Sequence, residues 1–222
     1  MGFIVAVDGP AGSGKGTITK KIAEEMNLTS IDTGAMYRSV TLAMLEANIK
    51  VDQIEKITKL LEQINIEFKR FGNEQKIFLN GKDVSLEIRT KKVNENVSQV
   101  SAIGIVRTKM AELQREMAKS IDVIMEGRDI GTNVFPNADV KIYLDATPEE
   151  RARRRVLQNQ EKGIEASYEE VLEKIKERDK RDSTRKVAPL KRAEDAIYLD
   201  STNLNIEQVV DKIIKIIEEK RK

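Results

Sequence analysis

The sequence predicts an α/β fold in which a mostly parallel sheet is flanked by helices. Short, continuously apolar runs, typical of strands buried on both faces, alternate with longer segments whose apolar residues recur at helical spacing. The first apolar run leads through a glycine-rich loop into a helix, which is how a βαβ unit begins. This regular alternation of strand and helix is typical of a parallel sheet with helices on its faces.

The predicted elements follow one another with short connections. Strands are expected at residues 3–7, 122–125, 140–144 and 196–199. Helices are expected at residues 17–26, 36–47, 51–64, 97–118, 168–181 and 206–219, and a further helix is expected to begin at Pro148. The start of that further helix is well marked, because Thr147 is a suitable N-cap residue and proline suits the first helical position.

The hydrophobic period changes between residues 64 and 81. Residues 64–69 and 76–79 alternate strictly between apolar and polar, and Gly72-Asn73 lies between them, so a β-hairpin is expected here. Asn80-Gly81 is a second turn signal. A hairpin inside a helix-rich chain indicates an inserted subdomain at about residues 50–95.

The composition excludes several classes of function. The 222 residues contain no His and no Cys, which rules out a Ser-His-Asp hydrolase, a zinc enzyme and disulfides. Lys and Arg number 39 against 37 Asp and Glu, a balance that disfavours a broad nucleic-acid surface. The N-terminal residues do not resemble a signal peptide, and no apolar stretch approaches the roughly 20 residues that span a bilayer. We therefore expect a cytoplasmic protein without membrane or nucleic-acid partners.

The strongest functional signal is the glycine-rich loop after the first predicted strand. Its glycines let backbone N–H groups point at a phosphate, and the following helix turns its N-terminal dipole toward the same anion. Lys15 supplies a charge for β- and γ-phosphates, and Thr17 is placed to hold Mg²⁺ or its water shell. The general pattern has Ser or Thr directly after the lysine, whereas Gly16 intervenes here. The predicted site consists of Gly9, Pro10, Ala11, Gly12, Ser13, Gly14, Lys15, Gly16 and Thr17.

A second candidate segment is residues 32–38. A strand end, a turn at Gly34 and a helix start would set Thr33, Tyr37 and Arg38 near the carboxyl edge of the sheet, where ligands gather in open α/β folds. A capped helix start with a solvated arginine explains the same pattern, and from spacing alone both interpretations stay open.

A third candidate segment, residues 126–132, follows another predicted strand. Glu126 stands where a phosphate-binding enzyme needs an acid to organise the water around Mg²⁺. Arg128 would pair with a phosphate, and Asp129 would accept hydrogen bonds from a base or sugar. The alternative interpretation is a strand-to-loop junction that carries a surface ion pair.

Two segments, residues 150–155 and 178–185, are rich in arginine. Such runs usually form a solvated helix face held by salt bridges. Guanidinium groups also stabilise the charge that spreads over a phosphoryl group during its transfer. The sequence pattern favours neither interpretation.

Taken together, these motifs resemble the cytidylate kinase family. The resemblance runs through residues 9–17, 32–38, 98–100, 126–132, 134–136, 178–185, 187–190 and 200–202. It implies a three-layer P-loop kinase fold with an inserted, hairpin-containing subdomain that binds the nucleoside monophosphate (NMP), and with a short helical lid. It also implies transfer of the ATP γ-phosphoryl group to CMP or dCMP, with Mg²⁺ as the metal.

The same resemblance assigns parts and roles. Residues 1–37, 100–150 and 166–222 would form the core, residues 38–99 the NMP-binding part and residues 151–165 the lid. Arg38 and Arg128 would hold the CMP α-phosphate. The cytosine would contact Ser98, Arg107, Asp129 and Arg185, and the sugar and its surroundings Thr33, Tyr37, Arg178 and Asp182. The catalytic residues would be Lys15, Arg128, Arg151, Arg154 and Arg178, and the metal would be held by Thr17 and, through water, by Glu126.

Alternatives from three classes remain to be distinguished. A kinase of the same architecture could use UMP, another deoxynucleotide or a small hydroxylated metabolite as acceptor. A P-loop GTPase would need an Asn-Lys-x-Asp segment to read guanine, and the sequence has none. An RNA-binding factor would use the arginine-rich segments on a phosphate backbone, which the near-neutral charge disfavours. We expect a monomer.

Overall fold

In the computed structural model, which describes residues 2–72, 74–161 and 163–221, the chain forms two compact units. Unit 1 consists of the residues up to Ile31 and those from Met117 onward, and unit 2 is Asp32–Glu116. Unit 2 thus extends beyond the 38–99 expected for the NMP-binding part. The residues expected to form the lid belong to unit 1.

The predicted parallel sheet is confirmed. It has five strands in the order β2-β6-β1-β7-β8, and β1 pairs in parallel with both β6 and β7. All five residues of β1 are buried, which explains why its sequence is a continuous apolar run that ends in a single acid. The strands are β1 (Ile4–Asp8), β2 (Thr29–Asp32), β6 (Val123–Gly127), β7 (Val140–Asp145) and β8 (Ile197–Asp200).

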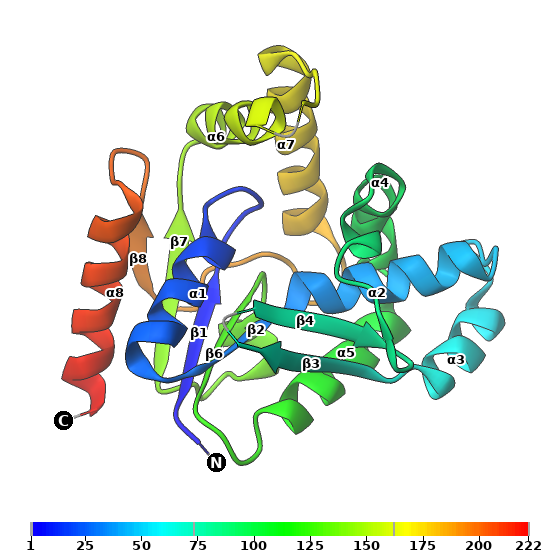
Figure 1. Ribbon diagram of the computed structural model, residues 1–222, viewed down its shortest axis with the longest axis horizontal. Coiled ribbons are helices and arrows are strands. Elements are labelled where there is room, and N and C mark those ends of the chain that lie inside the picture. The colour runs from blue at the N-terminus through cyan, green and yellow to red at the C-terminus, as the bar shows by residue number, and fades with distance from the viewer. Residues whose placement is uncertain (1, 73, 162, 222) are drawn as a thin grey trace. The chain divides into compact units, whose positions relative to one another are not determined.

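Helices α1 and α8 lie side by side along the sheet of unit 1 (Figure 1). Ile18 and Ile22 of α1 and Ile213 and Ile217 of α8 form one buried cluster with Val5 and other strand residues. Helices α6 and α7 pack against each other, and Thr147 accepts a hydrogen bond from the Glu150 N–H, as its predicted capping role requires. The helices of this unit are α1 (Lys15–Met26), the π-helical turn η2 (Ile130–Val134), α6 (Pro148–Glu161), α7 (Tyr168–Thr184) and α8 (Ile206–Arg221).

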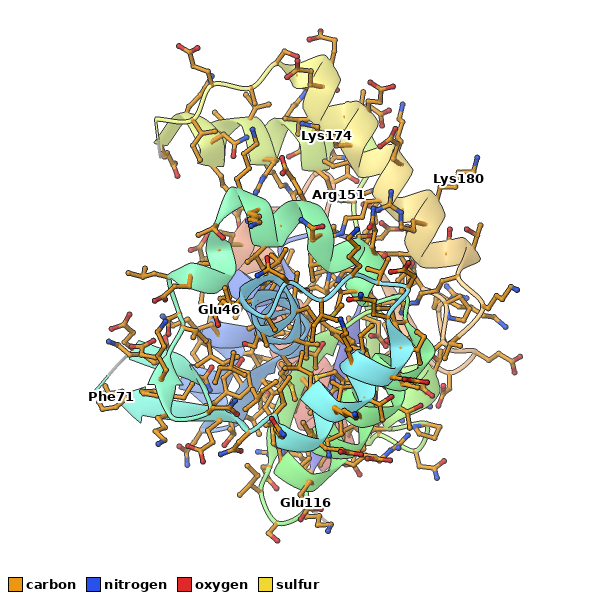
Figure 2. All side chains as sticks on the ribbon, turned by 90° about the vertical axis from the view of Figure 1, so that its right-hand side faces the viewer. Glu46, Phe71, Glu116, Arg151, Lys174 and Lys180 are labelled. Atoms are coloured by element: carbon orange, nitrogen blue, oxygen red, sulfur yellow. The ribbon has the colours of Figure 1, made fainter. Side chains whose placement is uncertain are left out.

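Unit 2 contains the predicted hairpin, extended by a short third strand. Its sheet has the order β3-β4-β5, and β3 runs antiparallel to β4. The turn at Asn80-Gly81 is confirmed, because both residues have positive φ, 49° and 82°. The β3–β4 turn contains Gly72, while Asn73 lies outside the described residues. Phe71, which precedes Gly72, is exposed (Figure 2). The elements are α2 (Thr33–Glu46), α3 (Ile54–Gln63), β3 (Ile66–Phe71), β4 (Glu74–Leu79), β5 (Lys82–Asp83), η1 (Glu87–Arg89), α4 (Lys91–Val100) and α5 (Gly104–Met117).

Two local predictions were wrong. The single helix expected at residues 97–118 is two helices, because α4 ends at Val100 and α5 begins at Gly104. The Ser101 side chain donates to the Ser98 carbonyl oxygen at the break, so a hydroxyl replaces part of the helical hydrogen bonding. Gly34 does not form a turn before α2 but lies in its first turn, since Asp32 caps the helix by accepting from the Ala35 N–H at 2.8 Å.

None of the helices among the described residues is long and apolar enough to cross a membrane.

The α1–α8 cluster predicts a clear stability difference between two isoleucines of α8. Ile213 is 0% exposed, so Ile213→Ala should lower the free energy of unfolding by about 3 kcal/mol through lost burial and a residual cavity. Ile206 is 43% exposed, so Ile206→Ala should cost less than about 1 kcal/mol. Urea titration of both variants measures the difference, and equal losses would contradict this packing.

Candidate active site

The glycine-rich loop between β1 and α1 has the backbone that the sequence predicts. Gly9, Gly12 and Gly14 all have positive φ. A Cβ atom on Gly9 would lie 2.0 Å from the Leu144 carbonyl oxygen, so only glycine lets this loop pass so close to β7. The loop ends at the N-terminus of α1, a 12-residue helix whose first N–H groups and dipole favour an anion.

Lys15 curls back into this loop. Its ammonium group donates to the carbonyl oxygens of Gly9 at 2.9 Å and Pro10 at 2.7 Å, and to the Ser13 hydroxyl at 3.2 Å. Burial, together with the positive charge of Arg128, lowers the pKa of Lys15 to about 7. The loop therefore holds a buried ammonium in a place where an added polyphosphate would stabilise its charged form.

Glu126, the last but one residue of β6, lies beside the start of α1. A Cβ atom on Gly16 would be 2.9 Å from a Glu126 carboxylate oxygen, so the glycine after Lys15 makes room for this acid. The neighbouring Thr17 is exposed. A carboxylate and a hydroxyl are oxygen ligands of the kind that Mg²⁺ prefers, and phosphates and water usually complete its shell. These two residues therefore fit the predicted metal, and the described residues contain no cluster of three or more acids that would form a separate metal cage.

Arg128 and Arg178 share one buried carboxylate in unit 1. The Arg128 Nε lies 3.2 Å from Asp182 Oδ2, and the Arg178 Nε lies 3.9 Å from the same oxygen. Arg128 follows β6, while the other two residues lie one helical turn apart on α7. The Asp182 side chain is 5% exposed, so its charge is little screened by water and holds two guanidinium groups together.

Asp129 and Arg185 form a second pair, which is more deeply buried. The Arg185 guanidinium lies 3.4 Å from Asp129 Oδ1 and also donates to the Ala188 carbonyl oxygen. Asn133 donates to the other carboxylate oxygen, Asp129 Oδ2, at 3.0 Å. A carboxylate and a guanidinium side by side offer acceptors and donors in one plane, which is the kind of surface that reads the polar edge of a base.

In unit 2, Arg38 of α2 carries a guanidinium that is only partly paired. It donates to Asp32 at 2.9 Å, and a Cβ atom on Gly34 would lie 3.2 Å from its NH1 atom, so the absence of a side chain at Gly34 leaves room for it. The Arg38 Nε is buried and has no hydrogen-bond partner within the part of the chain that the structure describes. A buried, unsatisfied donor of this kind is costly, which favours an anionic ligand as its partner.

Ser98, Arg107 and Tyr37 come from three helices of unit 2. Arg107 is 2% exposed, donates to the Ser101 carbonyl oxygen and places its guanidinium carbon 5.4 Å from the centre of the Tyr37 ring. The Ser98 hydroxyl is buried and lacks a partner among the described residues. Thr33, at the start of α2, is buried as well. Unit 2 thus contains five of the polar residues that the resemblance assigns to the nucleoside monophosphate, which are Thr33, Tyr37, Arg38, Ser98 and Arg107, and the others lie in unit 1.

Comparison with known proteins identifies the family. The family model described as "Cytidylate kinase" matches residues 5–219. The chain belongs to the cytidylate kinase family. Proteins named "Cytidylate kinase" from Fusobacterium nucleatum and Lactobacillus johnsonii are 55% and 52% identical to it, over 97% and 98% of this chain and 97% and 95% of theirs.

A solved structure supports the fold alone. The crystal structure of an uncharacterized protein from Eubacterium ventriosum matches with a TM-score of 0.52 at 13% identity, over 97% of this chain and 98% of that one. Cytidylate kinases are nucleoside monophosphate kinases, and this chain is one of them.

Arg151 occupies a different environment from the one expected for a lid arginine of this family. Its side chain is 3% exposed and lies beside α7, where it forms two hydrogen bonds with Asp179 (Figure 2). It also donates to the carbonyl oxygens of Ala146 and of Ala11 in the phosphate loop. The protein groups around this guanidinium make Arg151 a brace between α6, α7 and the loop.

Arg154 is likewise engaged by the protein. It donates to Glu150 on the preceding turn and to the hydroxyl and carbonyl oxygens of Ser201, which follows β8. Its side chain is 26% exposed, so it stays open to water and to a ligand on one side. Arg153, on the same helix, has a 70% exposed side chain.

Sequence reasoning missed three residues of this cytidylate kinase that organise the site. Asp179 holds Arg151, Ser201 holds Arg154, and Asp8 at the end of β1 accepts two backbone hydrogen bonds from η2. Asp8 carried a signal in the sequence, because it is an acid at the end of a strand that is otherwise wholly apolar. Asp179 and Ser201 lie in segments that carry the family resemblance, which assigned neither of them a role.

The brace around Arg151 predicts that its loss affects folding as well as turnover. Arg151→Ala leaves the Asp179 carboxylate and two carbonyl oxygens without this donor, so the free energy of unfolding should fall by about 3 kcal/mol. Arg153→Ala on the same helix should cost less than about 1 kcal/mol. Thermal and urea denaturation measure both, and an Arg151→Ala variant as stable as Arg153→Ala would refute the brace.

Proposed function

We propose that this chain catalyses transfer of the ATP γ-phosphoryl group to CMP and dCMP, which yields ADP with CDP or dCDP. The observation that carries the proposal is the match to the cytidylate kinase family over residues 5–219. The glycine loop with its buried Lys15 supports a nucleoside triphosphate as the donor. The arginines of both units support an acceptor that is itself an anion.

ATP is assigned to the loop from Gly9 to Thr17. Its phosphates would accept hydrogen bonds from the loop N–H groups and from Lys15, which would exchange its carbonyl partners for phosphate oxygens. Thr17 and, through water, Glu126 would hold Mg²⁺. When bound, that ion would neutralise charge on the β- and γ-phosphates.

CMP is assigned to residues from both units. Arg38 and Arg128 would hold its α-phosphate. The Arg38 Nε supports this role, because it is a buried donor without a hydrogen-bond partner among the described residues, and a phosphate oxygen would supply one. The cytosine would be read by Ser98, Arg107, Asp129 and Arg185. Thr33, Tyr37, Arg178 and Asp182 would surround the sugar and the space next to it.

The chemistry needs charge stabilisation more than proton transfer. An oxygen of the CMP α-phosphate attacks the γ-phosphorus, and the bond from that phosphorus to the β–γ bridging oxygen breaks, so ADP leaves with the electron pair. Lys15, Arg128 and Arg178 would neutralise the charge on the transferring group. The family resemblance assigns Arg151 and Arg154 to the same neutralisation of charge. To take part, Arg154 would have to exchange Glu150 and Ser201 for phosphate oxygens when α6 moves.

The nearest alternative is a kinase of this architecture with another acceptor. Its acceptor would be UMP, another deoxynucleotide or a small hydroxylated metabolite, so recognition of cytosine by Ser98, Arg107, Asp129 and Arg185 decides between the two. A cytoplasmic monomer stays our prediction, and sedimentation equilibrium would test its oligomeric state.

Substrate preference is the most direct test of the proposed function. With ATP as donor, kcat/KM for CMP and dCMP should exceed the values for AMP, GMP and TMP by at least about a hundredfold, because buried polar groups left unpaired by a wrong base are costly. A coupled assay of ADP formation measures each acceptor. Comparable turnover of AMP, GMP or TMP would overturn the assignment to cytidine nucleotides.

Loss of either phosphate-binding cation should abolish most turnover while the fold persists. Lys15→Ala and Arg128→Ala should each lower kcat/KM for CMP by at least about a hundredfold, since each removes a charge aimed at the transferring group. Lys20→Ala, which removes an exposed ammonium from the same helix as Lys15, is the matched control and should keep normal turnover. Near-normal activity of Lys15→Ala or Arg128→Ala, with unchanged circular dichroism, would refute the role of that residue.

A further inference from the structure

Asp8 stands at the carboxyl end of β1, directly before the phosphate loop. It is 5% exposed and accepts the N–H of Ile130 at 2.8 Å and the N–H of Gly131 at 2.7 Å. These are the first two residues of the π-helical turn η2, 122 and 123 positions away along the chain. Each carboxylate oxygen thus satisfies one backbone donor.

The first N–H groups of a helical turn have no partner inside it, and the preceding residue usually caps them with its own side chain. That residue here is Asp129, one of the residue types most favoured for capping, yet its side chain makes no cap hydrogen bond. The Asp129 carboxylate faces Arg185 and Asn133 instead. Asp8 supplies the cap from another strand, and this frees Asp129 for a different task.

Lys141 of β7 also lies against the start of η2. A Cβ atom on Gly131 would lie 3.2 Å from Lys141 Cδ and 3.5 Å from Asp8 Oδ2, so the absence of a side chain at Gly131 makes room for both of these side chains. The Lys141 ammonium is fixed in turn by Asp195 and by the Pro136 carbonyl oxygen. The start of η2 therefore packs against side chains from two strands of the sheet.

We propose that Asp8 is a positioning residue for the acceptor: by capping η2 in place of Asp129, it keeps the Asp129 carboxylate beside Arg185 and holds the adjoining Arg128 at the end of β6. The inference rests on the proposed function, because it takes Asp129 as a group that reads the base. It adds a residue that contacts neither nucleotide in that assignment.

The charge on Asp8 matters for this role. Burial raises the pKa of Asp8 to about 6, the two backbone N–H groups of Gly131 and Ile130 oppose that rise, Asp129 adds to it and Lys15 opposes it. Lys141 of β7 lies next to Gly131, and on the same strand burial, the charge of Asp145 and the charge of Asp8 raise the pKa of Tyr143. Above about pH 6 the carboxylate is ionised and both of its oxygens accept. Below that pH it is protonated, and one of them becomes a donor.

The decisive variant is Asp8→Asn. Its amide keeps the shape of the carboxylate but turns an N–H₂ group toward one of the two backbone N–H groups, so one donor of η2 loses its acceptor. At pH 7.5 we expect the KM for CMP to rise about tenfold, the KM for ATP to stay within about twofold, and the preference for CMP over UMP to fall by about tenfold. Asp139→Asn is the matched control. The Asp139 carboxylate likewise accepts a hydrogen bond from a backbone N–H of β1, that of Ile4 at the other end of the strand. The Asp139→Asn substitution should leave the KM for CMP and the KM for ATP unchanged.

The pH dependence separates this role from general stability. The CMP phosphate itself titrates near pH 6, so the measured quantity is the ratio of KM for CMP in Asp8→Asn to that in the unaltered enzyme. The ratio should be about ten at pH 7.5 and should fall to about threefold at pH 5.5, where most of the Asp8 carboxylate is protonated and has lost its second acceptor. A ratio independent of pH would overturn the role of the charge.

A second variant keeps the test decisive if Asp8→Asn does not fold. Gly131→Ala adds a Cβ atom 3.2 Å from Lys141 Cδ and 3.5 Å from Asp8 Oδ2, which displaces η2 from these two side chains, so it should reproduce the CMP-selective rise in KM. Equal rises in the KM for CMP and ATP, or no rise in either variant once folding is confirmed by thermal denaturation, would overturn the inference. Failure of the unaltered enzyme to phosphorylate CMP would instead overturn the proposed function.

Discussion

Mutual repulsion among cations is the constraint on which the rest of the site depends. A kinase must gather positive charge where two phosphate chains meet, and without nucleotides those charges repel one another. Lys15 shows the cost: it is buried, Arg128 and Arg178 carry like charge nearby, and its pKa falls to about 7. The chain meets this constraint by placing a protein oxygen beside each cation, and Arg128 and Arg178 share one of them.

These protein oxygens are arranged as replaceable partners. Asp182 holds Arg128 and Arg178, loop carbonyl oxygens hold Lys15, and Glu150 with Ser201 holds Arg154. A phosphate can replace an oxygen of this kind because it offers the same geometry with more charge. Arg151 differs, since four hydrogen bonds tie it to α7, to the residues before α6 and to the phosphate loop. We infer that it keeps the loop in shape while its neighbours exchange partners.

Local signals explain which parts of this arrangement the sequence predicts. The glycine loop is contiguous, and the strand before it and the helix after it are strongly patterned, so both its position and its chemistry can be read directly. The hairpin of unit 2 was predicted for the same reason, because alternation and the Asn80-Gly81 turn are short-range features. The break between α4 and α5 was missed because Ser101 is neither Gly nor Pro, and a hydroxyl bonding back to the Ser98 carbonyl oxygen has no periodic signature.

Long-range pairing explains what the sequence does not predict. The hydrogen bonds from Ile130 and Gly131 to Asp8 join residues more than 120 positions apart, and the contact between Arg151 and Asp179 depends on how α6 packs on α7. An arginine-rich helix looks the same in sequence whether a given guanidinium faces solvent, a carboxylate or a ligand.

Calorimetric titration of CMP into the nucleotide-free enzyme tests the central claim most directly. If a phosphate replaces Asp182 as the partner of Arg128, CMP should bind one to one, its affinity should fall as salt rises, and Arg128→Ala should lose most of it. CMP binding that is absent, or equally tight with and without the Arg128 guanidinium, would contradict the account.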